Sequence, residues 1–170
     1  SDTIYFLTDS DSQLLFAQES RFNTDESRLG GDDVIDAGAG DDIIFGQEGN
    51  DQITGGSGVD LIDGGSGNDT LAGGGHADTF VFSVSGINGD DVISDFNVAE
   101  DVLRFTDVVD SGDAGVDEND LDALLSVTSS ETSTIITFDN GGSVTINGFG
   151  DDSYITLQSL LGAGMQIDIV

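Results

Sequence analysis

Large apolar residues recur every nine positions through the middle of the chain, each two residues after an aspartate of the same period. The apolar residues are Ile35, Ile44, Ile53, Ile62, Leu71 and Phe80, and the aspartates are Asp33, Asp42, Asp51, Asp60, Asp69 and Asp78. Glycines precede each aspartate at fixed offsets, so the unit over residues 28–81 is G-G-x-G-x-D-x-U-x, with U apolar. A strict period indicates a repeat array, which the general preference of Asp and Gly for turns does not explain.

Each repeat predicts a short strand followed by a tight turn. The strand x-U-x buries one side chain, and the six Gly-rich residues turn the chain through conformations with positive φ. Two repeats make one coil, so odd and even repeats build separate parallel sheets whose U residues meet inside. We therefore predict an all-β fold, a parallel β-roll (right-handed β-solenoid).

Apolar patterns outside the array predict a few further elements. A degenerate seventh repeat covers residues 86–94, with Ile87 at a glycine position. Strands are expected at 3–7, 14–17, 101–105 and 165–169, a hairpin at 135–138 and 144–146, and short helices from Asp117 or Asn119 to Leu125 and over 156–161. The expected organisation is N-terminal flanking strands over 1–27, the roll over 28–95 and a C-terminal capping region over 96–170.

The charge of the chain points to cations as its partners. It has 34 acidic residues, of which 28 are Asp, against three Arg and no Lys, for a net charge of -31. This charge argues against nucleic acid and anionic membranes as partners, and no apolar stretch is long enough for membrane insertion. The hydrophobic content of 36% predicts a core once the charge is neutralised. Because Cys is absent, bound metal is the expected staple.

Calcium fits the repeat chemistry. It takes six to eight oxygen ligands, and Gly-rich turns free backbone carbonyls to supply several of them. Turns stacked on one edge of the roll lie 18 residues apart, so two aspartates can share one ion. The pairs are Asp33 with Asp51 and Asp51 with Asp69 on one edge, and Asp42 with Asp60 and Asp60 with Asp78 on the other. About four shared Ca²⁺ sites follow.

The candidate calcium ligands are the repeat aspartates, the turn glycines and two aspartates after the array. They are Asp33, Gly38, Gly40, Asp42, Gly46, Gly49, Asp51, Gly55, Gly56, Gly58, Asp60, Gly64, Gly65, Gly67, Asp69, Gly73, Gly74, Asp78, Asp91 and Asp95. Some repeats depart from the motif, because Arg28, Leu29, Ala37, Gln47 and His76 stand at glycine positions.

Without the ion, stacked carboxylates repel one another. Two charges about 4 Å apart cost roughly 1 kcal/mol in water and about 4 kcal/mol at an effective dielectric constant of 20. Several such pairs rival a typical domain stability of roughly 5 to 15 kcal/mol. We therefore expect calcium binding and folding to be one coupled reaction.

The patterns give little support to an enzyme. His76 is the only histidine, and zinc needs several His or Cys ligands. Paired aspartates such as Asp120 and Asp122, or Asp151 and Asp152, suit a glycosidase, but pairs are expected by chance among 28 Asp. No nucleophile elbow, phosphate loop or redox Cys is present. Any catalytic domain is expected upstream of this chain.

The repeats over 28–81 resemble the RTX modules of bacterial proteins exported by type I secretion, which include serralysin-type proteases, lipases, toxins, adhesins and the R-modules of alginate epimerases. Residues 78–82 and 91–96 resemble the exit from the roll in these families, and the hairpin with Asp168-Ile169-Val170 resembles their secretion-signal region.

The resemblance implies a secreted, extracellular or cell-surface module, expected as a monomer. It would stay unfolded in the cytosol, pass through the type I secretion apparatus, fold on calcium outside the cell and support an upstream passenger domain. The alternative is a module that binds polysaccharide or a cell surface. Only Arg21, Arg28 and Arg104 could pair with uronates, which disfavours alginate as a ligand.

One face of the predicted roll is apolar. The outward strand positions of the even repeats are Ile43, Phe45, Leu61, Asp63, Thr79 and Val81. Because contiguous apolar patches usually mark a contact, we expect the N-terminal strand at 4–7 or the hairpin near Phe138 to cover this face.

Overall fold

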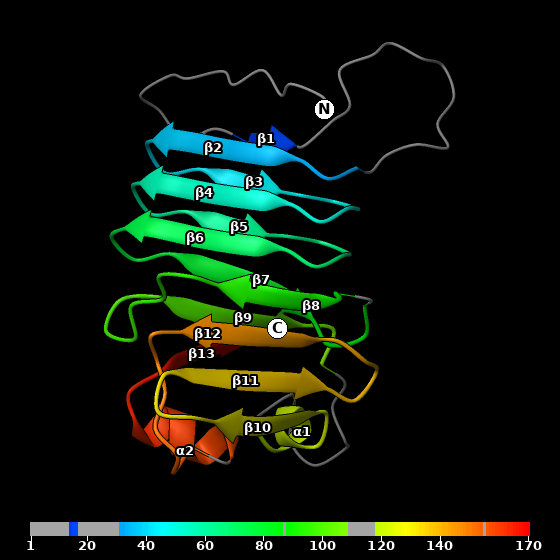
Figure 1. The fold of residues 1–170 in the computed structure, drawn as a ribbon, viewed down its shortest axis with the longest axis vertical. Coiled ribbons are helices and arrows are strands. Elements are labelled where there is room, and N and C mark those ends of the chain that lie inside the picture. The colour runs from blue at the N-terminus through cyan, green and yellow to red at the C-terminus, as the bar shows by residue number, and fades with distance from the viewer. Residues whose placement is uncertain (1–13, 17–30, 87, 109–117, 155) are drawn as a thin grey trace.

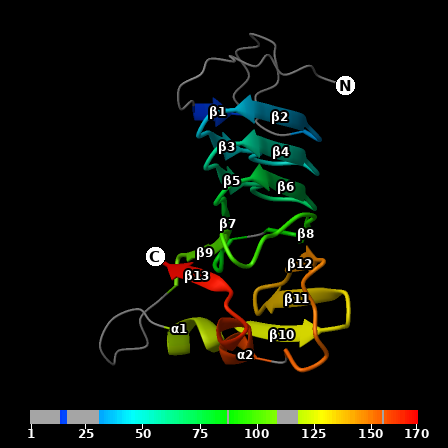
Figure 2. The ribbon, with the colours of Figure 1, turned by 90° about the vertical axis from the view of Figure 1, so that its left-hand side faces the viewer.

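The structure, a computed structural model, describes residues 14–16, 31–86, 88–108, 118–154 and 156–170. Its core is a stack of short strands in two sheets that face each other (Figures 1 and 2). The strand expected at residues 3–7 lies outside the described residues, whereas the one expected at 14–17 is present as β1.

Within the described residues, sheet A contains six strands. In spatial order they are β1 (Leu14–Phe16), β3 (Ile43–Phe45), β5 (Leu61–Asp63), β7 (Thr79–Ser83), β9 (Val102–Thr106) and β13 (Gln166–Ile169). Sheet B contains seven strands in the part of the chain that the structure describes. In spatial order they are β10 (Leu125–Ser129), β11 (Ser133–Phe138), β12 (Ser143–Asn147), β8 (Asp90–Ile93), β6 (Thr70–Gly75), β4 (Gln52–Ser57) and β2 (Val34–Ala39).

The register of the parallel strands follows the nine-residue period. In sheet A, Ile44 is level with Ile62 and Ile62 with Phe80. In sheet B, Ile35 is level with Ile53 and Ile53 with Leu71. All of these side chains are buried between the sheets, as one large apolar residue per repeat requires. The prediction of a parallel β-roll is confirmed.

The strands of the odd repeats are longer than predicted. β2, β4 and β6 each have six residues, because pairing continues through the glycines that follow the x-U-x segment. Gly56 pairs with both Gly38 and Gly74. A Cβ at Gly56 would overlap the carbonyl oxygen of Gly38, so only glycine allows the coils to stack this closely.

The two sheets continue past the repeats into the C-terminal region. β9 extends sheet A beside β7, and β13 pairs in parallel with β9. The predicted hairpin is present as β11 and β12, and β12 pairs in parallel with β8. Helices α1 (Glu118–Asp122) and α2 (Leu157–Gly162) lie at this end of the roll (Figure 2). None of the described helices has the length and apolar character that a membrane span requires.

The helix expected to run to Leu125 is shorter than predicted. It ends at Asp122, and Leu125 instead begins β10, where it pairs with Phe138. The second helix agrees with the prediction, because the Thr156 side chain caps it by accepting the Ser159 N–H at 3.1 Å.

The hairpin does not cover the outer face of the even strands, and that part of the prediction is wrong. Phe138 points into the core and is only 2% exposed. Its ring centroid lies 6.3 Å from that of Phe82 and 6.2 Å from that of Phe105, both in sheet A. The hairpin therefore packs its apolar side inward as part of sheet B rather than over the outside of sheet A.

Candidate calcium site

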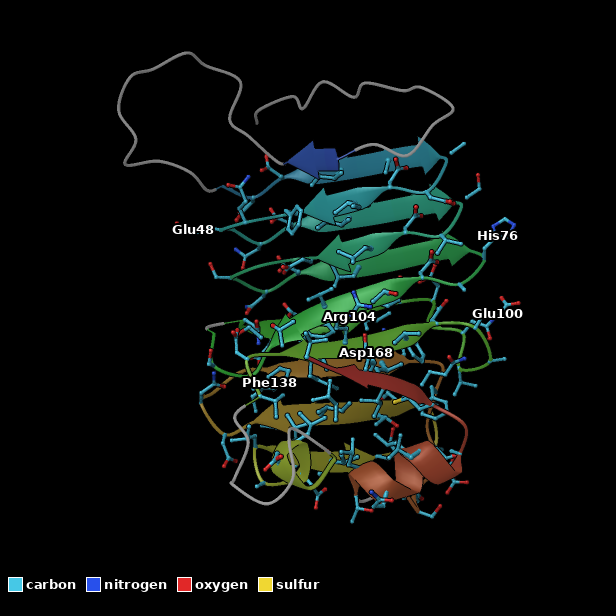
Figure 3. All side chains as sticks on the ribbon, turned by 180° about the vertical axis from the view of Figure 1, so that it is seen from behind. Glu48, His76, Glu100, Arg104, Phe138 and Asp168 are labelled. Carbon is cyan, nitrogen blue, oxygen red and sulfur yellow. The ribbon has the colours of Figure 1, made fainter. Side chains whose placement is uncertain are left out.

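The Gly-rich turns stack along two edges of the roll. Edge 1 contains residues 31–33, 46–51, 64–69, 86 and 88–91, which precede or begin strands of sheet B. Edge 2 contains the turns at 37–42, 55–60 and 73–78, which lead from sheet B to sheet A. Figure 3 shows Glu48 on the first of these edges and His76 on the second.

On edge 1, one carboxylate oxygen of each repeat aspartate binds the coil before it. Asp51 Oδ1 accepts the Asp33 N–H at 2.8 Å, and Asp69 Oδ1 accepts the Asp51 N–H at 2.8 Å. Asp91 Oδ1 adds another such bond with the Asp69 N–H at 2.9 Å. The aspartates are therefore stacked in the order that the 18-residue spacing predicts.

Edge 2 repeats the arrangement. Asp60 Oδ1 accepts the Asp42 N–H at 2.9 Å, and Asp78 Oδ1 accepts the Asp60 N–H at 2.9 Å. Asp78 in turn donates its N–H to Asp101 Oδ1 at 3.0 Å. Both edges thus hold a column of carboxylates inside the roll. That two aspartates share one ion stays a prediction.

The second oxygen of these carboxylates is buried without a protein donor. The Oδ2 atoms of Asp51, Asp60, Asp69 and Asp78 have no hydrogen-bond partner among the described residues. Each of these aspartates is only 1% exposed. A buried carboxylate oxygen without a donor is strongly unfavourable, so these atoms fit a bound cation.

Glycines leave the space beside these oxygens. A Cβ at Gly55, Gly64 or Gly73 would overlap the Oδ2 of the aspartate five residues later in the same turn. A Cβ at Gly46 would lie 2.5 Å from Asp51 Oδ2. Glycine is needed at these four positions because the carboxylate oxygen lies where a side chain would begin.

Backbone carbonyls converge on two of these spaces. The Gly64 carbonyl oxygen approaches the space at Gly46, and the Gly73 carbonyl oxygen would lie 2.8 Å from a Cβ at Gly55. Among the residues that the structure describes, no three His, Cys, Asp or Glu side chains form a metal-binding group. A cation here would take most of its ligands from carbonyls, as Ca²⁺ does in flexible all-oxygen sites.

The carboxylates resist ionisation in the metal-free fold. Burial raises the pKa of Asp51 from an ordinary value of 3.8 to about 7 and that of Asp78 to about 6. Burial likewise raises the pKa of Asp91 to about 7. The N–H from the preceding coil opposes the shift, and neighbouring carboxylates add to it. A divalent cation would reverse this balance by stabilising the charged form.

Other predicted ligands have different surroundings. Asp95 is exposed, and its two oxygens accept the N–H groups of Gly73 at 3.0 Å and Gly74 at 2.9 Å, so it closes edge 2 through hydrogen bonds. All of the remaining candidate glycines shape the turns through positive φ, namely Gly38, Gly40, Gly49, Gly56, Gly58, Gly65, Gly67 and Gly74. Gln47 and His76, at glycine positions, also adopt positive φ, 78° and 82°.

Sequence reasoning missed Asp101. Its Oδ1 accepts the Asp78 N–H, and its Oδ2 accepts the Asn97 N–H at 2.7 Å, so both oxygens are used within the protein. Asp101 therefore ends the carboxylate column of edge 2. The available signal was the D-x-U pattern of Asp101 and Leu103, because Leu103 is fully buried like the U residues.

Comparisons with known proteins agree with this geometry. Residues 29–62 and 54–83 match the family model of the RTX calcium-binding nonapeptide repeat. No curated protein sequence matches the chain.

Solved structures similar to this chain include an extracellular lipase and an epimerase subunit. The extracellular lipase LipA of Serratia marcescens is 26% identical, with a TM-score of 0.51, over 82% of this chain. The chain spans only 20% of that lipase. The AlgE6R3 subunit of the Azotobacter vinelandii mannuronan C5-epimerase is 24% identical, with a TM-score of 0.38, over 96% of this chain and 81% of that one. The repeat match and the fold together show that residues 29–83 are RTX calcium-binding nonapeptide repeats, folded as a parallel β-roll.

Proposed function

We propose that this chain is a folding module that calcium switches on outside the cell. The observation behind the proposal is the row of buried Oδ2 atoms at Asp51, Asp60, Asp69 and Asp78, which have no donor among the described residues and lie against glycines. Without cations these carboxylates must be either protonated or buried as unpaired charges, and both states destabilise the roll at neutral pH. At low calcium the chain is unfolded, and calcium supplies the missing interaction.

The test is a calcium titration of the full chain followed by far-UV circular dichroism. We expect little β-structure in chelator at pH 7.5 and a cooperative gain with a midpoint of about 10⁻⁴ to 10⁻³ M, the range of extracellular modules. Magnesium at the same concentration is the control and should not substitute, because it demands tight octahedral geometry. A spectrum that is unchanged by chelator would rule out the proposal.

The biological role that we propose is support of export and of a passenger domain. An unfolded, acidic chain suits passage through a type I exporter, and folding outside the cell then gives the domain before it a stable neighbour. The similarity to part of an extracellular lipase supports this role, because the lipase also places such a fold within a larger secreted protein. On this proposal the chain is secreted and non-catalytic.

A fusion experiment tests the passenger role separately. A reporter enzyme joined upstream of the chain should regain activity after denaturation in higher yield when calcium is present. The matched control is the same fusion with Asp60→Ala and Asp69→Ala, which keeps the length of the chain but removes two of the buried carboxylates. Equal recovery of the two fusions would contradict the passenger role without affecting calcium binding.

A further inference from the structure

A second column of polar side chains runs along edge 1, one residue before the buried aspartates. Asp32 Oδ1 accepts the Asn50 N–H at 2.8 Å and the Asn50 Nδ2–H at 3.0 Å. Asn50 Oδ1 accepts the Asn68 N–H at 2.9 Å, and Asn68 Oδ1 accepts the Asp90 N–H at 2.8 Å. Each of these four side chains is exposed and links its own coil to the next.

This column continues into the C-terminal hairpin. The Ser143 hydroxyl of β12 donates to Asp90 Oδ1 at 2.9 Å, and the Ser143 N–H donates to the Gly89 carbonyl at 2.8 Å. Asn140, in the hairpin turn, also donates from its side chain to the Gly86 carbonyl. The hairpin turn therefore stacks on edge 1 as one more coil, and it does so without a buried carboxylate.

Edge 2 has a much shorter column at the same turn position. Asp41 Oδ1 accepts the Val59 N–H at 2.8 Å. The Val59 side chain, 52% exposed, contains no acceptor that could bind the N–H of Ala77 in the next coil. Within the described turns, the column on edge 2 is thus a single bond between Asp41 and Val59, whereas edge 1 has a continuous series.

The hydrogen bonds of this column need no metal. They favour the stacked conformation of the edge 1 turns independently of the ion, so less of the cost of ordering these turns falls on calcium binding. Backbone strain does not separate the edges, since Gln47 on edge 1 and His76 on edge 2 both have positive φ. At the position before the buried aspartates, the edges differ in their side-chain column, and on edge 2 the bonds from Asp95 reach only the last turn, at Gly73 and Gly74.

We infer that the two edges bind calcium with unequal affinity, that edge 1 fills first, and that Val59 is the residue that weakens edge 2. This inference rests on the proposed function, because it presupposes that calcium binds the stacked turns. It predicts that partial calcium loading leaves edge 1 and the hairpin ordered while edge 2 still exchanges.

Hydrogen exchange of the full chain at graded calcium concentrations tests the inference. The reporters are four glycine N–H groups, two on each edge, that each donate to a carbonyl of the next coil. They are Gly49 to Ser66 and Gly67 to Asn88 on edge 1, and Gly40 to Ser57 and Gly58 to Gly75 on edge 2. We expect the edge 1 amides to reach half-protection at roughly threefold to tenfold less calcium, the effect of about one net hydrogen bond.

Variants at equivalent positions of neighbouring turns sharpen the test. Val59→Asn supplies an acceptor for Ala77 and should lower the edge 2 midpoint toward that of edge 1, whereas the control Val59→Ala should leave it unchanged. Asn68→Ala should raise the edge 1 midpoint. Equal midpoints for both edges in the parent, or equal effects of Val59→Asn and Val59→Ala, would overturn the inference while leaving calcium-dependent folding intact. Absence of any calcium-induced protection would instead overturn the proposed function, and the inference with it.

Discussion

Asp51 donates its backbone N–H to Oδ1 of Asp69, which lies 18 residues further along the chain, at 2.8 Å. The other oxygen of Asp69, Oδ2, is buried in the space that Gly64 leaves and has no donor among the described residues. One carboxylate therefore has two roles, because Oδ1 joins adjacent coils and Oδ2 remains for a cation. Asp60 and Asp78 divide their oxygens in the same way on edge 2.

Asp60→Ala should weaken calcium binding more than Asp33→Ala. Removing the Asp60 side chain leaves the buried Asp42 N–H without its acceptor and empties the space to which the Gly73 carbonyl also points. Asp33 lies at the first described turn and donates its backbone N–H to Asp51 Oδ1. The Asp33→Ala variant keeps this N–H and therefore this hydrogen bond. Titration of ellipticity with calcium should show a midpoint raised about tenfold or more for Asp60→Ala, the effect of a lost charge-assisted bond. Equal midpoints for the two variants would count against the stacked arrangement.

Acid should partly replace calcium. The pKa of Asp51 and of Asp91 is about 7 in the metal-free fold, against 3.8 for an ordinary aspartate. A folded-state pKa that is raised contributes stability below the unfolded value, and this stability is lost as the pH rises through the folded value. The calcium-stripped chain should therefore gain β-structure as the pH falls from 8 to 5. Circular dichroism in chelex-treated buffer measures this gain.

Folding in the presence of calcium should depend on pH in the opposite direction, and it serves as the control. Protons compete with calcium for the same carboxylates, so the calcium midpoint should increase as the pH falls over the same window. A metal-free chain that is equally unfolded at pH 8 and pH 5 would show that the buried carboxylates do not limit its stability.

Gly55→Ala should block one site. The added Cβ would overlap Asp60 Oδ2 and would lie 2.8 Å from the Gly73 carbonyl oxygen, the two oxygens that converge there. The variant should therefore require more calcium to fold and bind fewer ions at saturation, as measured by equilibrium dialysis. Gly162→Ala is the matched control, because a Cβ there meets no atom within 4 Å and the residue ends α2. If both variants bind as many ions as the parent, the space beside Asp60 is not a calcium site.

The sequence was sufficient to predict the roll because each repeat has an aspartate at the end of its turn and a large apolar residue in its strand. Asp33 to Asp78 keep a period of nine, and the buried apolar residue always follows by two. This phase fixes which residues face inward and which turns stack, so the parallel register followed without further information. The same phase also placed the carboxylates in columns.

The sequence was insufficient where the spacing changes. The step between stacked aspartates lengthens from 18 residues to 22 between Asp69 and Asp91, and to 23 between Asp78 and Asp101. A search by period therefore stops before Asp101, although its D-x-U pattern persists. The location of the hairpin was also beyond prediction, because β12 pairs with β8 through backbone hydrogen bonds that leave no mark on residue type.

His76→Gly should stabilise the roll. His76 has φ of 82° at a turn position that the repeat motif assigns to glycine, and a side chain there costs roughly 1 kcal/mol or more. Its exposed ring makes one hydrogen bond among the described residues, to the neighbouring Gly75 carbonyl at 2.7 Å, and also interacts electrostatically with the Asp60 carboxylate, so few interactions are lost with it. Thermal unfolding at saturating calcium should show a higher Tm by a few degrees. A lower Tm would mean that the interactions of the imidazole stabilise edge 2 by more than the positive φ of His76 destabilises it.

Phe138→Ala should show that the hairpin and the roll fold as one unit. Phe138 is 2% exposed, and its ring joins the hairpin to Phe82 and Phe105 in sheet A. Truncating a buried Phe costs about 3 to 5 kcal/mol. Because the lost contacts span both sheets, the cost should appear in the calcium-dependent folding of the repeats as well as in the hairpin. The measurement is the calcium midpoint for protection of the Gly49 and Gly58 amides by hydrogen exchange.

Phe149→Ala is the control for this prediction, since it removes the same side chain from a half-buried position. Phe149 stacks on Tyr154 with ring centroids 5.3 Å apart, in the loop after the hairpin. Such a pair contributes only about 0.5 to 1.5 kcal/mol beyond its buried area, so the repeat amides should keep nearly the parent midpoint. If Phe138→Ala instead exposes the hairpin amides and leaves the Gly49 and Gly58 midpoints unchanged, the hairpin folds onto a roll that is already complete. The shared aromatic core would then stabilise the hairpin alone, and calcium would act on the repeats without its help.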